Sequence, residues 1–392
     1  MTEAPVTAVI LAAGEGRRLE PLTNRRPKPM IPVANRPLLE YVVEAVAEAG
    51  LDHITLVVGY RHERIRNHFG DGDDWGVTIE YVEQSTQLGT GHAVLQAEST
   101  IDGPFVVLNG DRVVDSALVQ RVSAAARDGD SPTMAVTASE TPREYGVVTF
   151  DGEHVTGIDE KPEGPVETNR INAGVYGFSP AIFGAIRSTD TNGELALTAT
   201  LDELAEENGG VHAIRYTGRW LDVSNLWDLL TVNAGVIDTD PTTPYENQSD
   251  DDAVSVADDV VLADSTRIGP AVTIGGNTAV GPNVTIGANA VVENTIIFPD
   301  AVIGAGAVVR DAVVAGNAQI GPNVTIEGTP STMVVEDTVH HDIELGGVVG
   351  DNATIGPGAI LTTGAVVGDD ADTDAGVTID SRVTAGATVR RG

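Results

Sequence analysis

The sequence contains no cysteine, which excludes disulfide bonds, thiolate nucleophiles and cysteine-ligated zinc. Lysine is almost as scarce, because Lys28 and Lys161 are the only two in 392 residues. No apolar run approaches the length of a membrane-spanning helix, and the acidic N-terminus enters its first apolar run without a basic leader. We therefore expect a soluble, cytoplasmic protein with no signal peptide and no membrane partner.

Positive charge as a whole is in short supply. The chain has 58 acidic against 23 basic residues, so its formal net charge is −35, a balance that repels nucleic acid and anionic membranes. The acidic residues are dispersed through apolar-periodic segments, which favours a folded chain with a solvated acidic surface over a disordered one. This composition resembles that of proteins from salt-accumulating halophiles, in which the remaining lysines are candidates for chemistry.

Residues 1–237 alternate β-rich apolar runs with helical patterns. Such alternation is typical of an α/β fold, and it predicts a Rossmann-like domain with a mostly parallel sheet. The apolar runs predict strands at 6–13, 53–60, 77–82 and 104–111, and the helical spacing predicts helices within 36–50 and 91–98. The polar, proline-containing stretch at 238–253 is expected to be a linker.

A different period begins at Val254 and indicates a second domain at 254–392. One apolar residue recurs every six positions, which a helix cannot keep on one face but a three-sided coil of short strands can. The pattern predicts the left-handed parallel β-helix of hexapeptide-repeat proteins, interrupted by an excursion at 327–345. The expected inward residues are Val256, Leu262, Ile268, Ile274, Val280, Ile286, Val292, Ile320, Ile326, Val349, Ile355, Leu361, Val367 and Ile379, with one-residue slips near Phe298 to Ile303 and before Val314.

A glycine turn follows the first predicted strand and is itself followed by basic residues. Gly14-Glu15-Gly16 can turn backbone amides toward an anion, with Arg18 and Lys28 supplying full charge. The dinucleotide fingerprint needs a third glycine where Leu19 stands, and the P-loop needs Gly-Lys-Ser/Thr, which is absent. The plain alternative is a tight turn whose arginines are merely solvated.

The full stretch, "LAAGEGRRLEPLTNRRPKPMIPV", resembles the nucleotide-binding signature of the sugar-1-phosphate nucleotidyltransferases. The resemblance implies that Arg18 and Lys28 hold a nucleoside triphosphate, although Arg17 replaces the threonine usual in the family. It further implies a nucleotide-binding wall made by Leu11, Ala13, Gly14 and Gly16.

The segment "EQSTQLGTGHA" is similar to the pyrimidine-reading segment of N-acetylglucosamine-1-phosphate uridylyltransferases. This likeness implies that Gln84 and the backbone near Gly89 and Thr90 hold the base. An amide side chain plus a backbone amide can satisfy an imide edge, and glycines allow a close approach. Without the resemblance, the segment would be a glycine-rich turn that starts a helix at Thr90.

Two aspartates stand where the family holds its metal. "VVLNGD" ends a predicted strand on Asp111, and "GRWLDVSN" contains Asp222. Carboxylates at strand ends suit Mg²⁺, which prefers a few hard oxygen ligands plus substrate phosphates. The resemblance implies that Asp111 and Asp222 are the metal pair, whereas either residue taken alone would more often be a helix cap or a surface charge.

Three further motifs, "YGVV", "IDEKP" and "INAGVYGF", match the sugar-phosphate contacts of relatives. They imply that Gly146, Glu160, Lys161 and Asn172 meet the sugar phosphate, with Glu160 accepting sugar hydroxyls and Lys161 offering a compact charge. Lys161 could instead form an ordinary ion pair. Both lysines of the chain nevertheless fall within the two expected phosphate-binding motifs.

The reaction implied is the transfer of a nucleotidyl group from UTP to N-acetylglucosamine 1-phosphate, with Mg²⁺, giving UDP-N-acetylglucosamine and pyrophosphate. Uracil and thymine share the edge that Gln84 would read, so UTP and dTTP stay open, as does the identity of the sugar. One alternative is a glucose-1-phosphate uridylyl- or thymidylyltransferase with a purely structural β-helix. Another is a non-catalytic regulatory subunit.

The predicted β-helix could add a second activity. The layout resembles archaeal bifunctional enzymes that acetylate glucosamine 1-phosphate with acetyl-CoA, which would need a general base such as His340 or His341. Against this, no lysine follows Lys161, and Glu344 stands near the place of the tyrosine used by relatives. The two histidines could equally lie on a solvated loop. The β-helix could also serve only for assembly, and resemblance favours a homotrimer.

Overall fold

The computed structural model describes residues 5–59, 61–129, 132–189, 193–206, 210–239, 253–335 and 338–391. The chain forms two compact units, of which the first contains Met1–Glu15, Pro27–Met30 and Leu38–Asp222. The second contains Gly16–Arg26, Ile31–Pro37 and Val223–Gly392. These units do not coincide with the sequence-based division after residue 237, and most of the expected linker at 238–253 lies outside the described residues.

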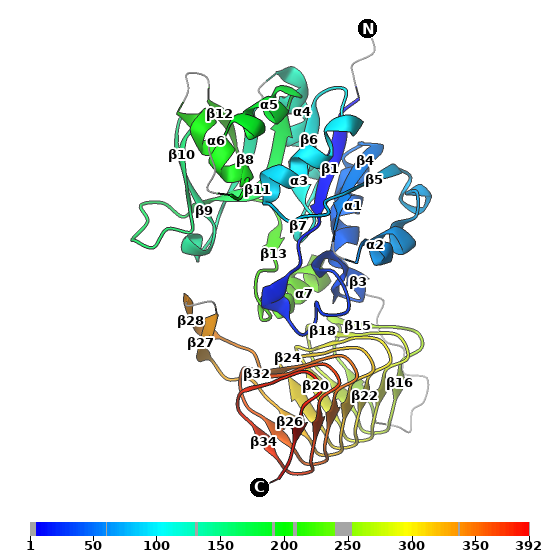
Figure 1. Cartoon of the computed structure of the whole chain (residues 1–392). Helices are drawn as coiled ribbons and strands as arrows, with labels where there is room; N and C mark the ends of the chain where they lie inside the picture. The colour runs from blue at the N-terminus through cyan, green and yellow to red at the C-terminus, as the bar shows by residue number, and fades with distance from the viewer. Residues whose placement is uncertain are drawn as a thin grey trace. The chain divides into compact units, whose positions relative to one another are not determined.

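Within its described residues, the first unit is built on a nine-stranded sheet (Figure 1). The strands from β5 to β6 are parallel, whereas β11 runs antiparallel to both β6 and β8. The sheet is therefore mixed, and its parallel half carries the strands expected from the apolar runs. In order across the sheet the strands are β5 (Thr78–Glu83), β4 (His53–Val58), β1 (Thr7–Ala12), β6 (Phe105–Asn109), β11 (Arg170–Phe178), β8 (Thr133–Ala138), β12 (Val211–Arg215), β10 (His154–Glu160) and β9 (Gly146–Asp151).

Helices cover both faces of this sheet. Side chains alternate between the faces of a strand, so Ile10 of β1 packs with the helices of one face and Val9 with those of the other. The first face is covered by α1 (Leu38–Glu48), α2 (His62–Phe69) and α4 (Ser116–Asp128), and the second by α3 (Thr90–Gln96), α5 (Ala181–Ser188) and α6 (Leu197–Ala205). Among the described residues, no helix is long and apolar enough to cross a membrane.

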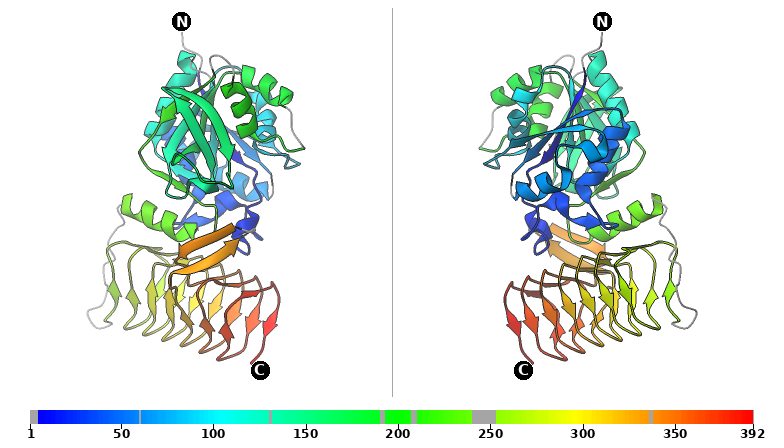
Figure 2. Two further views of the ribbon diagram at one scale, coloured as in Figure 1. Left: turned by 90° about the vertical axis from the view of Figure 1, so that its left-hand side faces the viewer. Right: turned by 90° about the vertical axis from the view of Figure 1, so that its right-hand side faces the viewer.

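The second unit contains a β-helix whose three parallel sheets are seen from the side in Figure 2. The first sheet consists of β14 (Ser255–Val256), β17 (Thr273–Ile274), β20 (Val291–Glu293), β23 (Val308–Arg310), β26 (Thr325–Ile326), β31 (Ile360–Leu361) and β34 (Thr378–Ile379). The second consists of β15 (Val260–Leu262), β18 (Thr278–Val280), β21 (Ile296–Ile297), β24 (Ala312–Val314), β29 (Gly347–Val349), β32 (Ala365–Val367) and β35 (Arg382–Val383). The third consists of β16 (Arg267–Ile268), β19 (Thr285–Ile286), β22 (Val302–Ile303), β25 (Gln319–Ile320), β30 (Thr354–Ile355), β33 (Asp372–Thr373) and β36 (Thr388–Val389).

The predicted six-residue period is confirmed by the core of this β-helix. From Ile274 onward the expected inward residues are buried in one apolar cluster, and Val256, Leu262 and Ile268 pack against it. The one-residue slips are visible in the strand pairing, because Val280 pairs with Ile297, one position short of the step that joins Leu262 to Val280. The expected excursion is a hairpin of β27 (Ser331–Val335) and β28 (Thr338–Ile343), drawn in orange in Figures 1 and 2.

The second unit also gathers residues from the N-terminal part of the chain. β2 (Pro32–Val33) pairs with β3 (Arg36–Pro37), and α7 (Asp228–Thr239) contacts both β2 and β18. Asn233 of α7 is fully buried, where its oxygen accepts from the Ala34 amide at 2.8 Å and its nitrogen donates to the Asn277 carbonyl at 2.7 Å. Because both ends of the Asn233 amide are used, its burial carries no unpaired polar group.

Three consecutive side chains bind the segment 16–26 to coils of the β-helix. Asn24 donates to Asp369 at 3.0 Å, and Arg25 pairs with Asp370 at 2.5 Å on the exposed surface. Arg26 is buried, donates to Asp351 at 2.5 Å and stacks over the Phe298 ring at 4.9 Å. The Arg26–Asp351 pair is thus a buried contact between segments that lie far apart in the sequence.

We expect Arg26→Met to lower the free energy of unfolding of the chain by about 3 kcal/mol, because it leaves the Asp351 carboxylate buried without its counter-charge. The measurement is urea denaturation in molar KCl. The matched control is Arg25→Met, which removes a neighbouring but exposed ion pair and should leave the unfolding transition unchanged. Equal effects of the two substitutions would contradict this account of the buried pair.

Candidate active site

A cavity of about 310 Å³ lies in the first unit at the carboxyl-terminal ends of β1, β5 and β6. These strands belong to the parallel half of the sheet, so their carboxyl ends meet at one edge, where α/β proteins bind ligands. The cavity is lined by Leu11, Ala13, Gly14, Lys28, Pro29, Gln84, Gln87, Gly89, Thr90, Ala93, Asn109, Asp111 and Glu194.

The glycine turn after β1 is held by contacts with its neighbours. The Gly110 amide donates to the Leu11 carbonyl at 2.9 Å, and the Gln87 amide nitrogen donates to the Ala13 carbonyl at 2.9 Å. A Cβ on Gly59 would lie 3.0 Å from the Ala13 oxygen, so this glycine keeps the turn in place. Leu11, Ala13 and Gly14 therefore line the cavity in a backbone that these contacts hold in place, and their predicted role in nucleotide binding stays a prediction.

Lys28 begins a short 3-10 helix, η2 (Lys28–Met30), and its ammonium forms an ion pair with Asp111. Both side chains line the cavity, with 15% and 26% of their surface exposed. Burial alone would raise the pKa of Asp111, but the charges of Lys28 and Arg112 outweigh it and hold that pKa below its usual range. Lys28 and Asp111, each predicted separately from the sequence, are thus adjacent at one wall.

Gln84, Gly89 and Thr90 of the "EQSTQLGTGHA" segment line the same cavity, and the predicted role of these residues in holding a base stays a prediction. The glycines of this segment also leave room for the backbone at Leu195, a close contact that the sequence did not predict. A Cβ on Gly89, whose φ is +98°, would lie 2.5 Å from the Leu195 carbonyl oxygen, and the Gly91 amide donates to that oxygen at 2.7 Å. These glycines accommodate the chain at Leu195, which brings Glu194 to the cavity.

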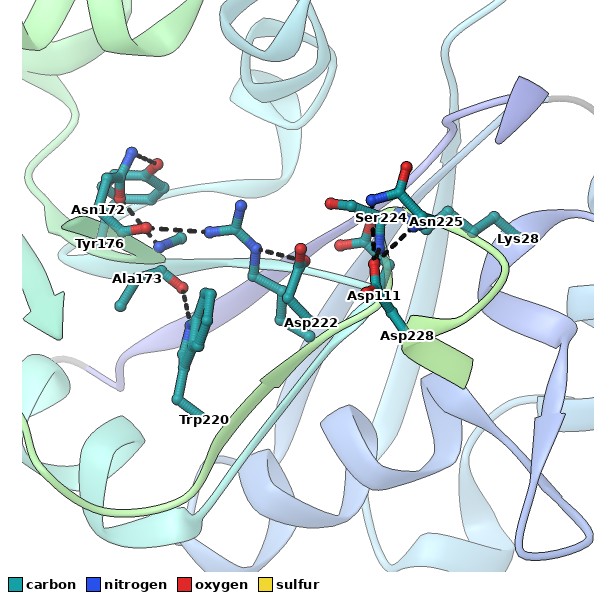
Figure 3. A network of polar contacts seen from close by, with 12 residues as sticks. Lys28, Asp111, Asn172, Ala173, Tyr176, Trp220, Asp222, Ser224, Asn225 and Asp228 are labelled. Carbon is teal, nitrogen blue, oxygen red and sulfur yellow. Dashed lines mark hydrogen bonds and ion pairs between the residues drawn. The ribbon is translucent and has the colours of Figure 1, made fainter. Parts of the chain in front are cut away.

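Of the two predicted metal ligands, Asp222 lies in a short two-stranded ribbon and Asp111 directly precedes it. β7 (Arg112–Val114) pairs with β13 (Trp220–Asp222), and Asp222 stands opposite Arg112, the residue after Asp111. Arg112 Nε donates to the nearly buried Asp222 carboxylate at 3.1 Å. Figure 3 shows the contacts of Asp222 and Asn172, which Arg112 connects by donating from Nη1 to the Asn172 carbonyl at 3.3 Å.

The sugar-phosphate candidates also come together in part. Gly146 pairs directly with Glu160 in the β9–β10 ladder, and a Cβ on Gly146 would lie 2.9 Å from Glu160 Oε2 and 3.7 Å from the Asn172 Cβ. Asn172 is buried and donates to the Tyr176 hydroxyl at 2.7 Å. Lys161 follows Glu160 with an exposed side chain and a φ of +49°.

The remaining predicted residues lie in the second unit, and their roles stay predictions. Arg18 lies in the 3-10 helix η1 (Arg17–Leu19), and Gly16 directly precedes this helix. His340 in β28 is buried beside the Trp227 ring at 5.0 Å, and His341 is exposed, with its Nδ1 3.3 Å from the Thr332 hydroxyl. The acetyl-transfer base, the acetyl-CoA co-substrate and the trimer likewise stay predictions.

Arg112, Gln87, Asn109 and Glu194 were not singled out by the sequence reasoning. Asn109 and Gln87 lie inside the quoted motifs "VVLNGD" and "QLGTGHA", so those motifs could have found them. Arg112 follows Asp111 directly, but its importance depends on the pairing of β7 with β13. Glu194 had no signal, because it reaches the cavity through the contact of Leu195 with the chain near Gly89.

The carboxylates of Asp111 and Asp222 supply the hard oxygen atoms that Mg²⁺ prefers. Among the described residues, no group of three or more His, Asp or Glu side chains could hold a metal ion by itself. Two carboxylates suit Mg²⁺ when substrate phosphates and water complete its shell, which is its usual manner of binding. The residues present therefore fit a substrate-bridged Mg²⁺ and not a metal site made by the protein alone.

The model of the nucleotidyl transferase family matches residues 7–239, which is more than half of the chain. The chain belongs to this family. Residues 256–345, within the β-helix, match a second model, described as the GMPPB C-terminal domain.

Two relatives illustrate the range of the family. "Bifunctional protein GlmU" of Methanococcus maripaludis is 36% identical over 58% of this chain and 53% of its own length. The chain thus spans about half the length of the archaeal relatives that it matches. "Glucose-1-phosphate thymidylyltransferase" of Streptomyces antibioticus is 34% identical over 67% of this chain and 76% of its own length. A solved UDP-glucose pyrophosphorylase, 22% identical, shares the fold with a TM-score of 0.54 over 60% of this chain and 100% of that chain.

Gly89→Ala should destabilise the first unit more than a matched glycine substitution does. Gly129 has a φ of +95° and a ψ of 8°, in the left-handed region, with open space around its Cβ, so Gly129→Ala gives the cost of that region alone, about 1 to 2 kcal/mol. Gly89, with a ψ of 173°, adopts an extended conformation that is nearly exclusive to glycine, and a Cβ there would also clash with the Leu195 carbonyl. Urea denaturation of the two variants measures the difference, and equal free energies of unfolding would contradict the close contact.

The Lys28–Asp111 pair should make stability depend on acid pH. Because the folded pKa of Asp111 is lowered, its contribution is fully present above the unfolded value of about 3.9 and is lost as the pH falls through the folded value. The free energies of unfolding of wild type and Asp111→Asn should therefore converge as the pH falls below about 4. A gap that stays constant with pH would show that the ion pair is not its source.

Proposed function

We propose that the chain transfers a nucleotidyl group from UTP to N-acetylglucosamine 1-phosphate, giving UDP-N-acetylglucosamine and pyrophosphate. The observation that carries this proposal is a single cavity lined by Gly14, Lys28, Gln84 and Asp111, four residues assigned to nucleotide or metal binding from the sequence. Family membership supports the reaction class, and the resemblance of the "QLGTGHA" segment to uridylyltransferases supports the base.

Residues that line the cavity and residues outside its lining would bind different parts of the substrates. In the lining, Gln84 would bind the base and Lys28 the triphosphate. Glu160 and Asn172, beside Gly146, would meet the sugar phosphate, and Arg112 connects Asn172 to the Asp222 carboxylate. Lys161 would add positive charge at the sugar phosphate, and the role of Arg18, which belongs to the second unit, stays a prediction from the family resemblance.

In the proposed reaction, a phosphate oxygen of the sugar 1-phosphate attacks the α-phosphorus of the triphosphate. The new P–O bond forms as the bond from the α-phosphorus to the bridging oxygen breaks, and pyrophosphate leaves with that electron pair. The attacking oxygen is already anionic, so no general base is needed, and catalysis rests on alignment and on neutralising charge. Asp111 and Asp222 would hold Mg²⁺, which would stabilise the negative charge of the substrate phosphates.

A second candidate is a glucose-1-phosphate thymidylyl- or uridylyltransferase. The Streptomyces relative bears the thymidylyltransferase name, and its match covers more of both chains than that of the archaeal proteins. Thymine presents the same hydrogen-bonding edge as uracil, so Gln84 suits both bases.

The test is pyrophosphate release by the purified chain in molar KCl with Mg²⁺. UTP and dTTP are each combined with the 1-phosphates of N-acetylglucosamine, glucosamine and glucose. Fastest release from UTP and N-acetylglucosamine 1-phosphate is the expected result. A preference for glucose 1-phosphate would favour the second candidate. If a folded sample releases no pyrophosphate in any combination, both candidates are contradicted.

Lys28→Ala should lower turnover at least about a hundredfold, because it removes a cation that stabilises the departing pyrophosphate. Steady-state pyrophosphate release measures the change. The matched control is Arg187→Ala, which removes an exposed cation of the same unit that pairs with Glu98. Turnover of Lys28→Ala close to that of the control would refute the assignment.

A further inference from the structure

The base-reading side chain of the cavity is held by its own chain. Gln84 directly follows β5, its backbone amide donates to the Val58 carbonyl at 2.8 Å, and only 3% of the residue is exposed. Its side-chain nitrogen makes two contacts, with the Gly89 carbonyl at 3.3 Å and with His92 Nδ1 at 2.9 Å. Both hydrogens of the Gln84 amide group are used inside the protein when His92 carries its ring proton on Nε2 and accepts at Nδ1.

This pairing decides which end of the amide is available to a ligand. With the nitrogen committed to Gly89 and His92, the carbonyl oxygen of Gln84 is the remaining hydrogen-bonding group, and an amide oxygen can only accept. Uracil and thymine carry an N3–H donor, which matches an acceptor. Cytosine has an unprotonated N3 at the same place, and two acceptors facing each other repel.

His92 is the side-chain partner of this amide nitrogen, and it holds the orientation together with the Gly89 carbonyl. The two ends of a glutamine amide have nearly the same shape, so surrounding hydrogen bonds alone decide which end faces the cavity. His92 lies in the first half of α3 and presents Nδ1 to the Gln84 side-chain nitrogen at 2.9 Å. Nδ1 accepts from Gln84 in the tautomer that carries the ring proton on Nε2, so the 3.2 Å contact between Nε2 and the Gln96 nitrogen is not a hydrogen bond that supports this arrangement.

We propose that His92 is a positioning residue that turns the Gln84 amide oxygen toward the cavity, so that the site selects uracil- or thymine-type triphosphates over CTP. The inference deepens the proposed function and rests on it for the role of Gln84. His92 acts only through Gln84 and does not touch the reacting atoms.

The test compares two polar substitutions that differ in where they carry an acceptor. His92→Asn keeps an oxygen near the place of Nδ1, whereas His92→Gln carries its amide farther out, near the place of Nε2. Calorimetric titration with UTP and with CTP, both with Mg²⁺, gives the ratio of dissociation constants for each variant. His68→Asn, at an exposed histidine of the same unit that pairs with Glu40, is the matched control.

We expect wild type, His92→Asn and the control to share a strong preference for UTP. His92→Gln should reduce that preference about tenfold, the effect of one misplaced hydrogen bond. In turnover assays the same variant should raise KM for UTP and leave kcat within about twofold, because positioning of the base precedes the chemical step.

Two results would overturn the inference. One is an equal preference for UTP in His92→Asn and His92→Gln, and the other is a wild-type chain that binds CTP as tightly as UTP. A wild-type chain that prefers UTP in the titration but turns over no sugar 1-phosphate would remove the proposed function alone, and the comparison of the two His92 variants would still decide the inference.

Discussion

Parallel hydrogen bonding of β1 to β4 and β6 sets where the cavity-lining side chains lie. The register joins Leu11 to Asn109 and Ala12 to Val58, so three strand ends meet at one edge of the sheet. The glycine turn, Asp111 and the chain leading to Gln84 all leave the sheet at that edge. Any slip of this pairing would separate groups that the proposed reaction needs within one cavity.

The fold was largely predictable because its signals are local. Continuous apolar runs indicate buried parallel strands, and the six-residue period of the β-helix is strong enough that even its one-residue slips could be read. The antiparallel pairings of the sheet were not predicted, since nothing local to β11 specifies that it pairs with both β6 and β8. The return of residues 16–26 to the coils of the β-helix depends on Arg26 and Asp351, which are 325 positions apart.

The sequence motifs predicted residues that line the cavity, but they did not predict the hydrogen bonds and ion pairs that hold those residues in place. Lys28, Gln84 and Asp111 were predicted because each belongs to a recognisable stretch, and all three line one cavity, while their roles stay predictions. Arg112 and His92 were not predicted, because each matters through a contact with another site residue. Arg112 pairs with Asp222, and His92 contacts the Gln84 amide nitrogen. A sequence pattern indicates the groups that a ligand requires more readily than the contacts that orient those groups.

The account's central claim is that the cavity binds a pyrimidine nucleoside triphosphate with its base at Gln84 and its phosphates at Lys28. A crystal structure of the chain with UTP and Mg²⁺ tests this claim most directly. The account predicts the uracil N3 within hydrogen-bonding distance of the Gln84 side-chain oxygen and the triphosphate beside Lys28. A nucleotide bound elsewhere, or bound with its base turned away from Gln84, would contradict it.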